Sequence, residues 1–401
     1  MSQVLWIAVK NASSTNVCLI RGKCPATVQT KVQHLTTSAA TATATDRGRT
    51  GRQLFADEAF DVERHLFNRP GYPDHLYSWV KAFHGQARCG VGSVLLDLGC
   101  GPGLVAFPLL DSFRGGLIGI DTSQVMVKSA PGALAAWLAS QGGGRAGGLD
   151  PCRARFEVGS SGGMTKIVPD ESVDLAIAAT AAHWFDYATT WKELTRVLKP
   201  KGSVVWWTYG EHYLPGHSEL QTTIFRFWQA DRPDSLGHYW PQPGRSYLTD
   251  LLKPLPFPRD PLCRGLLSRD LVNQWDASSS IRKAHSLESR GRADLSWLRC
   301  PDLQTSDLSD PFRLEQVWNW NQYKPYIRTS SALHNYLKIH PEEKEEPGDL
   351  ATLAAEEIKA RVLANRKESV GENAYAQADR QLDDDHVRIA WPLGLMAIKK
   401  K

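Results

Sequence analysis

The chain has 401 residues, of which 42% are hydrophobic and 22% are charged, and its formal net charge is +4. This composition is typical of a soluble globular protein, and the length allows two or three domains or one enlarged domain. No run of about 18 apolar residues is present, so we expect neither a transmembrane helix nor a membrane partner. The lysines and arginines form no basic cluster, which argues against nucleic acid as a partner.

The seven cysteines and the N-terminal composition bear on metal binding and compartment. No C-x-x-C pair and no matching histidine spacing is present, so we expect no metal site and a reducing, cytoplasmic environment. Residues 1–45 contain no Asp or Glu and many Ser and Thr. We interpret residues 1–50 as a disordered extension, one added by a wrongly chosen start codon, or a mitochondrial transit peptide.

Residues 51–212 are predicted to form the main domain, which begins with helical sequence. Residues 53–83 indicate a lead-in helix followed by an amphipathic one. Pro73 suits a first helical turn. Apolar side chains then recur at helical spacing, namely Leu76, Trp79, Val80 and Phe83.

The stretch 94–103, VLLDLGCGPG, predicts a strand that runs into a ligand-binding turn. Its three glycines would let the backbone turn sharply and approach a ligand, with Asp97 beside them. Leu104 occupies the third glycine position of a dinucleotide fingerprint, which disfavours an NAD-dependent oxidoreductase. Asp121 ends the next strand, where an acid bonds ribose hydroxyls in nucleotide-binding units. The alternative for both acids is a turn or helix-capping role.

Strands and helices alternate after this motif. We expect strands at 116–120, 154–158, 173–179 and 203–208, and helices at about 103–113, after the N-cap Ser123, and at 188–198. This order predicts an α/β fold: a Rossmann-like, mainly parallel sheet with helices on both faces. Ligands in such folds bind at the carboxyl ends of the strands.

The alternation stops at about residue 213. Helical patterns at 217–231, 313–338 and 348–366 predict a mainly helical lid over 213–384, and residues 385–401 are expected to add a last strand to the core sheet. Residues 258–310 are rich in Ser, Arg and Asp and lack periodicity. We interpret them as a mobile insertion or as translated intron sequence.

Four motifs in order carry a resemblance to a known family. They are NRPGYP (68–73), D-x-G-x-G-x-G (97–103), the stretch from VPDESVDLAIAATAAHWFD (168–186) through WKELTRVLKPKGSVVWWTY (191–209), and YIRTSSALHNY (326–336). Together they resemble class I S-adenosylmethionine-dependent methyltransferases of the type 11 family. The similarity is strongest to its fungal branch of trans-aconitate methyltransferases and related small-molecule enzymes. The resemblance implies a seven-stranded sheet and S-adenosylmethionine as cofactor.

The resemblance also implies roles for individual residues. His183 and Trp184 would line the acceptor pocket, with His183 as a base or as a residue that orients its loop. Tyr72 would cover the methionine end of the cofactor. The remaining cofactor-binding residues are expected to be Asp97, Gly99, Cys100, Gly101, Gly103, Asp121, Thr122, Ser161 and Thr180.

One segment departs from the family pattern. The family usually places an acid after the third strand to bond the adenine amino group, but Ser160, Ser161, Gly162 and Gly163 stand here. Adenine binding would then depend on backbone groups, Ser161 or apolar stacking. The departure leaves open a non-catalytic, methyltransferase-like partner protein.

The sequence therefore predicts a methyltransferase that acts on a small organic molecule, either a carboxylic acid or an intermediate of secondary metabolism. An acceptor in RNA or protein is the alternative within the same fold. High tryptophan content suggests aromatic walls for a flat acceptor, and Arg328 is a candidate for pairing with an acceptor carboxylate or for a surface salt bridge.

Overall fold

The computed structural model describes residues 68–141, 153–232, 234–263, 265–284, 313–343, 348–368 and 374–401. These residues all belong to one compact unit. The interpretations of residues 1–50, of the lead-in helix up to residue 67 and of residues 285–310 lie outside the described ranges.

The core of the fold is a sheet with strand order β3-β2-β1-β4-β5-β8-β6, to which β7 is added by pairing with β8. The first five strands of this order are parallel, and β8 is antiparallel to each of its neighbours. The strands are β1 Val94–Leu98, β2 Gly116–Asp121, β3 Ala154–Val158, β4 Val173–Ala179, β5 Leu198–Tyr209, β6 Trp275–Ala284, β7 Arg313–Asn319 and β8 His386–Lys400.

Ten described helices surround this sheet or lie beyond its end. They are α4 Asp74–His84, α5 Gln124–Ser140, α6 Tyr187–Val197, α7 Gln221–Gln229, α8 Gly244–Thr249, α9 Arg269–Asn273, α10 Trp320–Arg328, α11 Ser331–Ile339, α12 Leu350–Lys367 and α13 Ala374–Asp379. Among these helices, none combines the length and apolarity needed to cross a bilayer.

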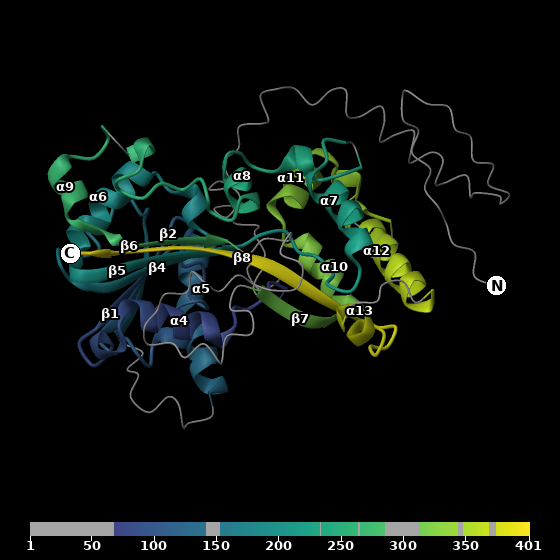
Figure 1. The fold of residues 1–401 in the computed structure, drawn as a ribbon, viewed down its shortest axis with the longest axis horizontal. Helices are drawn as coiled ribbons and strands as arrows, with labels where there is room; N and C mark the ends of the chain where they lie inside the picture. Colours follow the sequence, from purple (N-terminus) through teal and green to yellow (C-terminus); the bar gives the residue numbers. More distant parts are fainter. Residues whose placement is uncertain are drawn as a thin grey trace. The chain divides into compact units, whose positions relative to one another are not determined.

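The sheet is covered on both faces because successive strand residues point in opposite directions. Leu95 packs in one apolar cluster with residues of α4 and α5, while the adjacent Leu96 packs in a second cluster with residues of α6. Figure 1 shows α4 and α5 on one side of the sheet and α6 and α9 on the other. This confirms the Rossmann-like α/β fold with helices on both faces.

Most predicted elements are present, but three expectations need correction. Residues 103–113 form turns and a short 3₁₀ helix, Phe107–Leu109, instead of an α-helix. Residues 313–319 form β7 instead of the start of a helix. Within 258–310, the stretch 269–284 is ordinary fold, since it forms α9 and β6. The sheet consequently has eight strands rather than seven.

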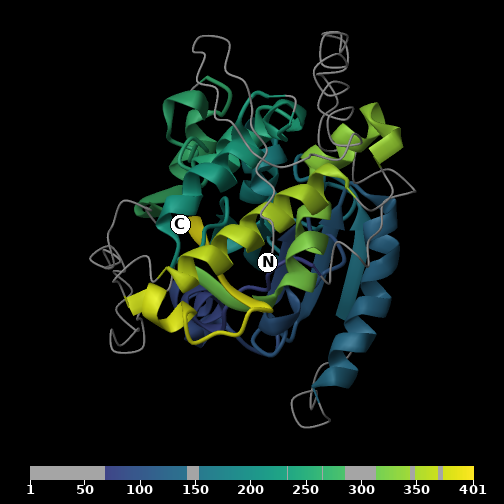
Figure 2. The same cartoon turned by 90° about the vertical axis from the view of Figure 1, so that its right-hand side faces the viewer.

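The long strand β8 joins the sheet to the lid. Its second half, from Leu393, pairs with β5, whereas its first half, up to Pro392, pairs with β7. The helices α7, α10, α11 and α12 gather at the end of β8 that pairs with β7 (Figures 1 and 2). The lid region therefore contributes β6 and β7 to the sheet as well as helices.

Candidate active site

A cavity of about 390 Å³ lies at the carboxyl ends of the parallel strands. The loops after β1 to β5 form one part of its wall, and residues of the lid form the other. The lining residues used below are Arg69, Tyr72, Asp97, Gly99, Cys100, Gly101, Asp121, Thr122, Ser160, Ser161, Thr180, His183, Trp184, Tyr209, Glu211, Trp228, Trp240, Arg245, Tyr326, Ser330 and Ser331.

The glycine loop after β1 has a left-handed backbone at Gly99, Gly101 and Gly103, with φ values of 69°, 52° and 88°. A Cβ atom at Gly99 would lie 2.4 Å from the Cβ of Ala181, so this glycine allows two loops to touch. A Cβ at Gly101 would meet nothing within 4 Å, although Gly101 lines the cavity. The backbone at Gly101 is therefore open to a ligand.

Gly103 corrects one expectation, since it is not among the residues that line the cavity. It is buried, and a Cβ there would lie 2.8 Å from the ring of Phe107. Gly103 therefore lacks a side chain because the ring of Phe107 packs directly against its backbone. Cys100 does line the cavity, but burial raises the pKa of its thiol, which agrees with a space-filling role.

Asp121 organises the glycine loop. Its Oδ2 accepts a hydrogen bond from the Gly101 N–H at 2.9 Å, and its Oδ1 accepts one from the Ser123 N–H at 2.8 Å. Ser123 in turn caps α5 by accepting from the Met126 N–H. A carboxylate has further lone pairs, so Asp121 retains capacity to accept hydroxyl groups of a ligand.

Asp97 is a buried acid with an unsatisfied oxygen. Its side chain is 1% exposed, and its Oδ2 has no hydrogen-bond partner. Burial, and then the nearby charge of Asp121, raises the pKa of Asp97 to about 8. A cation bound in the cavity would supply the missing partner and stabilise the carboxylate.

Thr180 follows β4 and contacts both the neighbouring strand β5 and the loop that precedes α4. It has a left-handed backbone, with φ 49°, which is uncommon for a β-branched residue. Its Oγ1 lies 2.7 Å from the Tyr72 hydroxyl and 3.2 Å from the Thr208 hydroxyl. The ring of Tyr72 packs edge-on against Trp207. These contacts fix the Tyr72 side chain in the wall of the cavity.

The segment that departs from the family pattern is held by α6. The Ser161 hydroxyl lies 2.7 Å from the Thr190 hydroxyl, and the Met164 N–H donates to Glu193 at 2.8 Å. Gly162 fits closely beside α6, because a Cβ there would lie 2.2 Å from the Thr189 hydroxyl oxygen.

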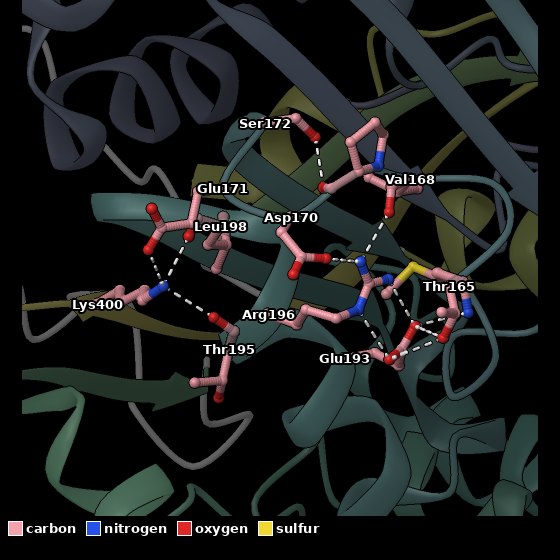
Figure 3. Close-up of polar contacts among 12 residues, drawn as sticks. Thr165, Val168, Asp170, Glu171, Ser172, Glu193, Thr195, Arg196, Leu198 and Lys400 are labelled. Carbon is pink, nitrogen blue, oxygen red and sulfur yellow. Dashed lines mark hydrogen bonds and ion pairs between the residues drawn. The ribbon is translucent and has the colours of Figure 1, made fainter.

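An ion-pair network on α6 supports that segment (Figure 3). Arg196 donates to both carboxylate oxygens of Glu193, at 3.1 and 2.9 Å, and to Asp170 at 2.5 Å. The hydrogen bonds from Arg196 lower the pKa of Glu193 despite partial burial. The Glu193 carboxylate thus holds the loop that contains Met164. It does not line the cavity, so it does not replace the acid that the family usually places next to the adenine amino group.

His183 and Trp184 follow β4 on a short 3₁₀ helix, Ala182–Trp184, and both line the cavity. Their ring centroids are 4.6 Å apart. His183 is 5% exposed and its Nδ1 has no hydrogen-bond partner. Burial, and then the positive charge of Arg245, lowers the pKa of His183 to about 3. Its imidazole is therefore neutral at ordinary pH.

A charged pair that the sequence analysis did not identify joins the lid to the end of β5. Arg245 of α8 donates to Glu211 at 2.5 Å, and its guanidinium lies 3.9 Å from the ring centroid of Trp240. His212 also contacts Glu211, with Nδ1 at 3.0 Å from Oε1. Burial opposes ionisation of Glu211, but Arg245 and His212 outweigh it and lower the pKa of its carboxyl.

Arg69 was also missed as a site residue, although it lies in the NRPGYP motif. It donates to the Tyr209 hydroxyl at 3.0 Å and to the Thr329 carbonyl at 2.9 Å. Arg328, by contrast, pairs with the buried Asp349 and does not line the cavity. The carboxylate-binding role considered for Arg328 is thus wrong.

The structure brings eleven of the twelve predicted site residues together in one cavity, with Gly103 as the exception. Tyr209, Trp228 and Trp240 are among the aromatic residues that line the cavity, whereas Trp206, Trp207, Trp318 and Trp320 are buried in the core. Within the described ranges, no three His, Cys, Asp or Glu side chains gather as a metal site.

Comparison with known proteins found similarity to methyltransferases. The family described as "Methyltransferase domain" matches residues 96–206, which run from β1 into β5. A protein named as a methyltransferase in Dictyostelium discoideum is 27% identical over 198 residues, which cover 49% of this chain and 64% of that protein. The match thus spans less than two thirds of that relative.

Two further similarities were found. A Saccharomyces cerevisiae protein, named "probable S-adenosylmethionine-dependent methyltransferase CRG1", is 24% identical over 64% of this chain and 87% of its own length. A solved structure titled as a type II methyltransferase from Anaeromyxobacter dehalogenans is 20% identical, with a TM-score of 0.47 over 82% of this chain and 97% of that one.

The parallel sheet, the glycine loop and the two acids define a nucleotide-type cofactor site of the Rossmann-like class. The match over residues 96–206 and the similarity to proteins named as S-adenosylmethionine-dependent methyltransferases support a class I methyltransferase domain in this part of the chain, with S-adenosylmethionine as its cofactor.

The residues present fit that cofactor. The unsatisfied oxygen of the buried Asp97 suits the ammonium group of the methionine moiety, and the open backbone at Gly101 leaves room beside it. Asp121 has the position and the free acceptor capacity for ribose hydroxyls.

Proposed function

We propose that this protein transfers a methyl group from S-adenosylmethionine to a small organic molecule. The observation that carries the proposal is the continuity of the cavity from the glycine loop to a second part walled by Trp184, Trp228, Trp240 and the Glu211–Arg245 pair. A volume of about 390 Å³ falls within the range of small-molecule sites. Aromatic walls with a few fixed polar groups favour a flat acceptor.

The proposed catalysis depends on positioning. S-adenosylmethionine supplies an already activated methyl group, so orientation of the acceptor provides most of the rate enhancement. Trp184 and Trp240 would hold the acceptor and exclude water. We assign His183 to hydrogen bonding with the acceptor, because an imidazole with a pKa of about 3 holds a proton poorly at neutral pH.

The proposed cofactor residues are those that the cavity brings together. Asp97 would contact the ammonium group, Asp121 the ribose, and Gly99 to Gly101 the methionine moiety, while Tyr72 and Thr180 close the wall above it. Adenine would lie near Ser160 and Ser161 without a carboxylate partner. The Ser161 hydroxyl already contacts Thr190, so we assign it to shaping the loop.

A labelled-methyl assay tests the proposal. The purified protein is titrated with S-adenosylmethionine by calorimetry and then incubated with methyl-labelled cofactor and a cell extract separated into small molecules, protein and RNA. We expect binding of the cofactor and label in the small-molecule fraction. Label in protein or RNA would contradict the small-molecule acceptor. Undetectable cofactor binding would instead support a non-catalytic partner protein.

The variant Asp121→Ala provides the control for the assigned site. It removes the acceptor of the Gly101 and Ser123 N–H groups, so we expect loss of cofactor binding and of labelling. Asp111→Asn, which changes an exposed acid on the same domain, should leave both unaffected. Normal cofactor affinity in Asp121→Ala would show that the cofactor binds elsewhere.

A further inference from the structure

The strand order indicates where the base of the cofactor would lie. Asp97 on β1 would hold the ammonium group, and Asp121, at the end of the neighbouring β2, would hold the ribose. The next strand outward is β3. The base leaves the ribose on the side opposite to the methionine moiety, so it would lie at the carboxyl end of β3. Gly159, Ser160 and Ser161 line the cavity there.

The backbone of Ser160 is held on both sides. The Gly159 N–H donates to the Asp121 carbonyl at 2.9 Å, and the Gly163 N–H donates to the Ser160 carbonyl at 3.0 Å. The first of these bonds ties the loop to the strand end that carries the ribose-binding acid. Ser160 therefore has a defined place beside the expected base.

Ser160 carries a free hydroxyl in this loop. The Ser161 hydroxyl lies 2.7 Å from that of Thr190, whereas no described group forms a hydrogen bond with the Ser160 hydroxyl. Ser160 is partly exposed and lines the cavity. A neutral hydroxyl that is open to water can donate or accept, and it exchanges water for a ligand group with little net gain.

The charges and the apolar side chains of the cavity lie elsewhere around the expected base. In the described part of the chain, the acids that line the cavity are Asp97, Asp121 and Glu211. The first two lie on β1 and β2, and Glu211 follows β5 on the acceptor side. Ile120 and Met126 line the cavity close to Asp121 in sequence. Such apolar side chains contact the faces of a purine whatever its substituents are.

We propose that Ser160 is the position that sets selectivity for the exocyclic amino group of the cofactor's adenine. With a serine here, the protein binds purine nucleosides through the ring faces and the ribose and selects only weakly for the amino group. The ligand class is therefore wider than adenosine derivatives, and extends to purine ribosides that carry another group at the amino position. This inference rests on the cofactor placement within the proposed function.

The test compares S-adenosylhomocysteine with its purine analogue, in which a hydrogen atom replaces the amino group of adenine. The two ligands share the amino-acid tail, the ribose and the purine ring system, so the ratio of their affinities isolates the amino group. Calorimetry with the purified full chain measures both affinities. We expect S-adenosylhomocysteine to bind more tightly by less than about tenfold, because a neutral, hydrated hydroxyl contributes little.

Three variants connect this ratio to Ser160. Ser160→Asp introduces a carboxylate and should raise the preference for the amino group by about tenfold or more, since hydrogen bonds to a charged acceptor are stronger. Ser160→Asn matches that side chain in shape without its charge and should raise the preference less. Ser140→Asp adds the same charge at the exposed end of α5, outside the cavity, and should leave the ratio unchanged. Thermal melting of each variant shows that it is folded.

Three results would overturn the inference. A preference of about tenfold or more in the original protein would show that another group selects for the amino group. An unchanged ratio in Ser160→Asp would place the base away from this side chain. Loss of both ligands in Ser160→Asp would show that the carboxylate opposes the cofactor instead of bonding with it. Failure of the proposed function has a different signature, because the original protein would then bind neither ligand or would label protein or RNA.

Discussion

The protonation of Asp97 in the cofactor-free protein has a measurable consequence. With a pKa of about 8, Asp97 is mostly protonated at neutral pH. The ammonium group of S-adenosylmethionine would favour the carboxylate, so its binding should release up to one proton at about pH 7 and almost none above about pH 9. Calorimetric titration in buffers of different ionisation enthalpy measures this release.

The matched variant for this prediction is Asp97→Asn. It should bind the cofactor more weakly and release no proton, because the amide cannot ionise. Proton release that persists in Asp97→Asn would assign the titrating group to another residue, with Asp121 the nearest candidate.

The role of His183 can be distinguished by the size and pH dependence of the effect of mutation. Since its pKa is about 3, His183 should remain neutral over the working range. His183→Asn should lower kcat by about tenfold, which is less than the 100-fold or more typical of a lost general base. The dependence of kcat on pH between about pH 5 and pH 8 should be the same in the original protein and in the variant, because His183 does not titrate in this range.

The glycine loop allows binding and folding to be separated within one element. Gly99→Ala places a Cβ 2.4 Å from Ala181 in a left-handed backbone, so we expect a loss of about 2–4 kcal/mol in the free energy of unfolding. Gly101→Ala faces open space in the cavity and should cost only about 1 kcal/mol. Its main effect should be weaker cofactor binding.

Denaturant unfolding and cofactor titration of the two variants provide the measurement. A Gly99→Ala protein as stable as the original would show that the two loops separate easily. A Gly101→Ala protein with normal cofactor affinity would place the cofactor away from this part of the loop.

Elements with a local signal could be predicted from the sequence. The strands β1, β2 and β4 and the 203–208 part of β5 are largely apolar runs, and Ser123 stands at the N-cap of α5. The helix predicted at residues 313–319 was wrong because the sequence pattern is ambiguous. Leu314 and Trp318, both buried, are four residues apart, which fits one face of either a helix or a strand. Pairing with β8, about 70 residues away in sequence, decides between the two.

The acceptor side of the cavity has no comparable local signal. Glu211 and Arg245 lie on different elements and meet only because α8 folds over the end of β5. Arg69 gains its position from Tyr209 and Thr329, which are 140 and 260 residues away in sequence. Such pairs follow from tertiary contacts and leave no spacing pattern.

At the scale of the molecule, a buried network should make stability depend on acid pH. Asp379, 1% exposed, accepts from Arg366 at 2.8 Å and lies 2.7 Å from Nε2 of His217. Burial opposes ionisation, but these partners lower the pKa of Asp379 to about 2, from 3.8. A lowered pKa stabilises the folded state above pH 3.8, and this contribution is lost as the pH falls towards 2.

The difference between the two pKa values corresponds to about 2 kcal/mol. Asp379→Asn should therefore unfold more easily at neutral pH by at least this amount and lose the dependence on pH in this window. Urea unfolding between pH 2 and 4 measures the slope, with Asp111→Asn as the control. An unchanged slope in Asp379→Asn would assign the acid sensitivity to other carboxylates.

The strand β8 also determines how the cavity can open. Pro392, which has no N–H group, lies where β8 exchanges β7 for β5 as its partner. One continuous strand thus pairs with the parallel sheet through β5 and with the lid region through β7. A hinge between them would have to bend this strand or break its hydrogen bonds. We therefore expect a methyl acceptor to enter through smaller displacements of cavity-lining segments such as 237–249, which carry Trp240 and Arg245.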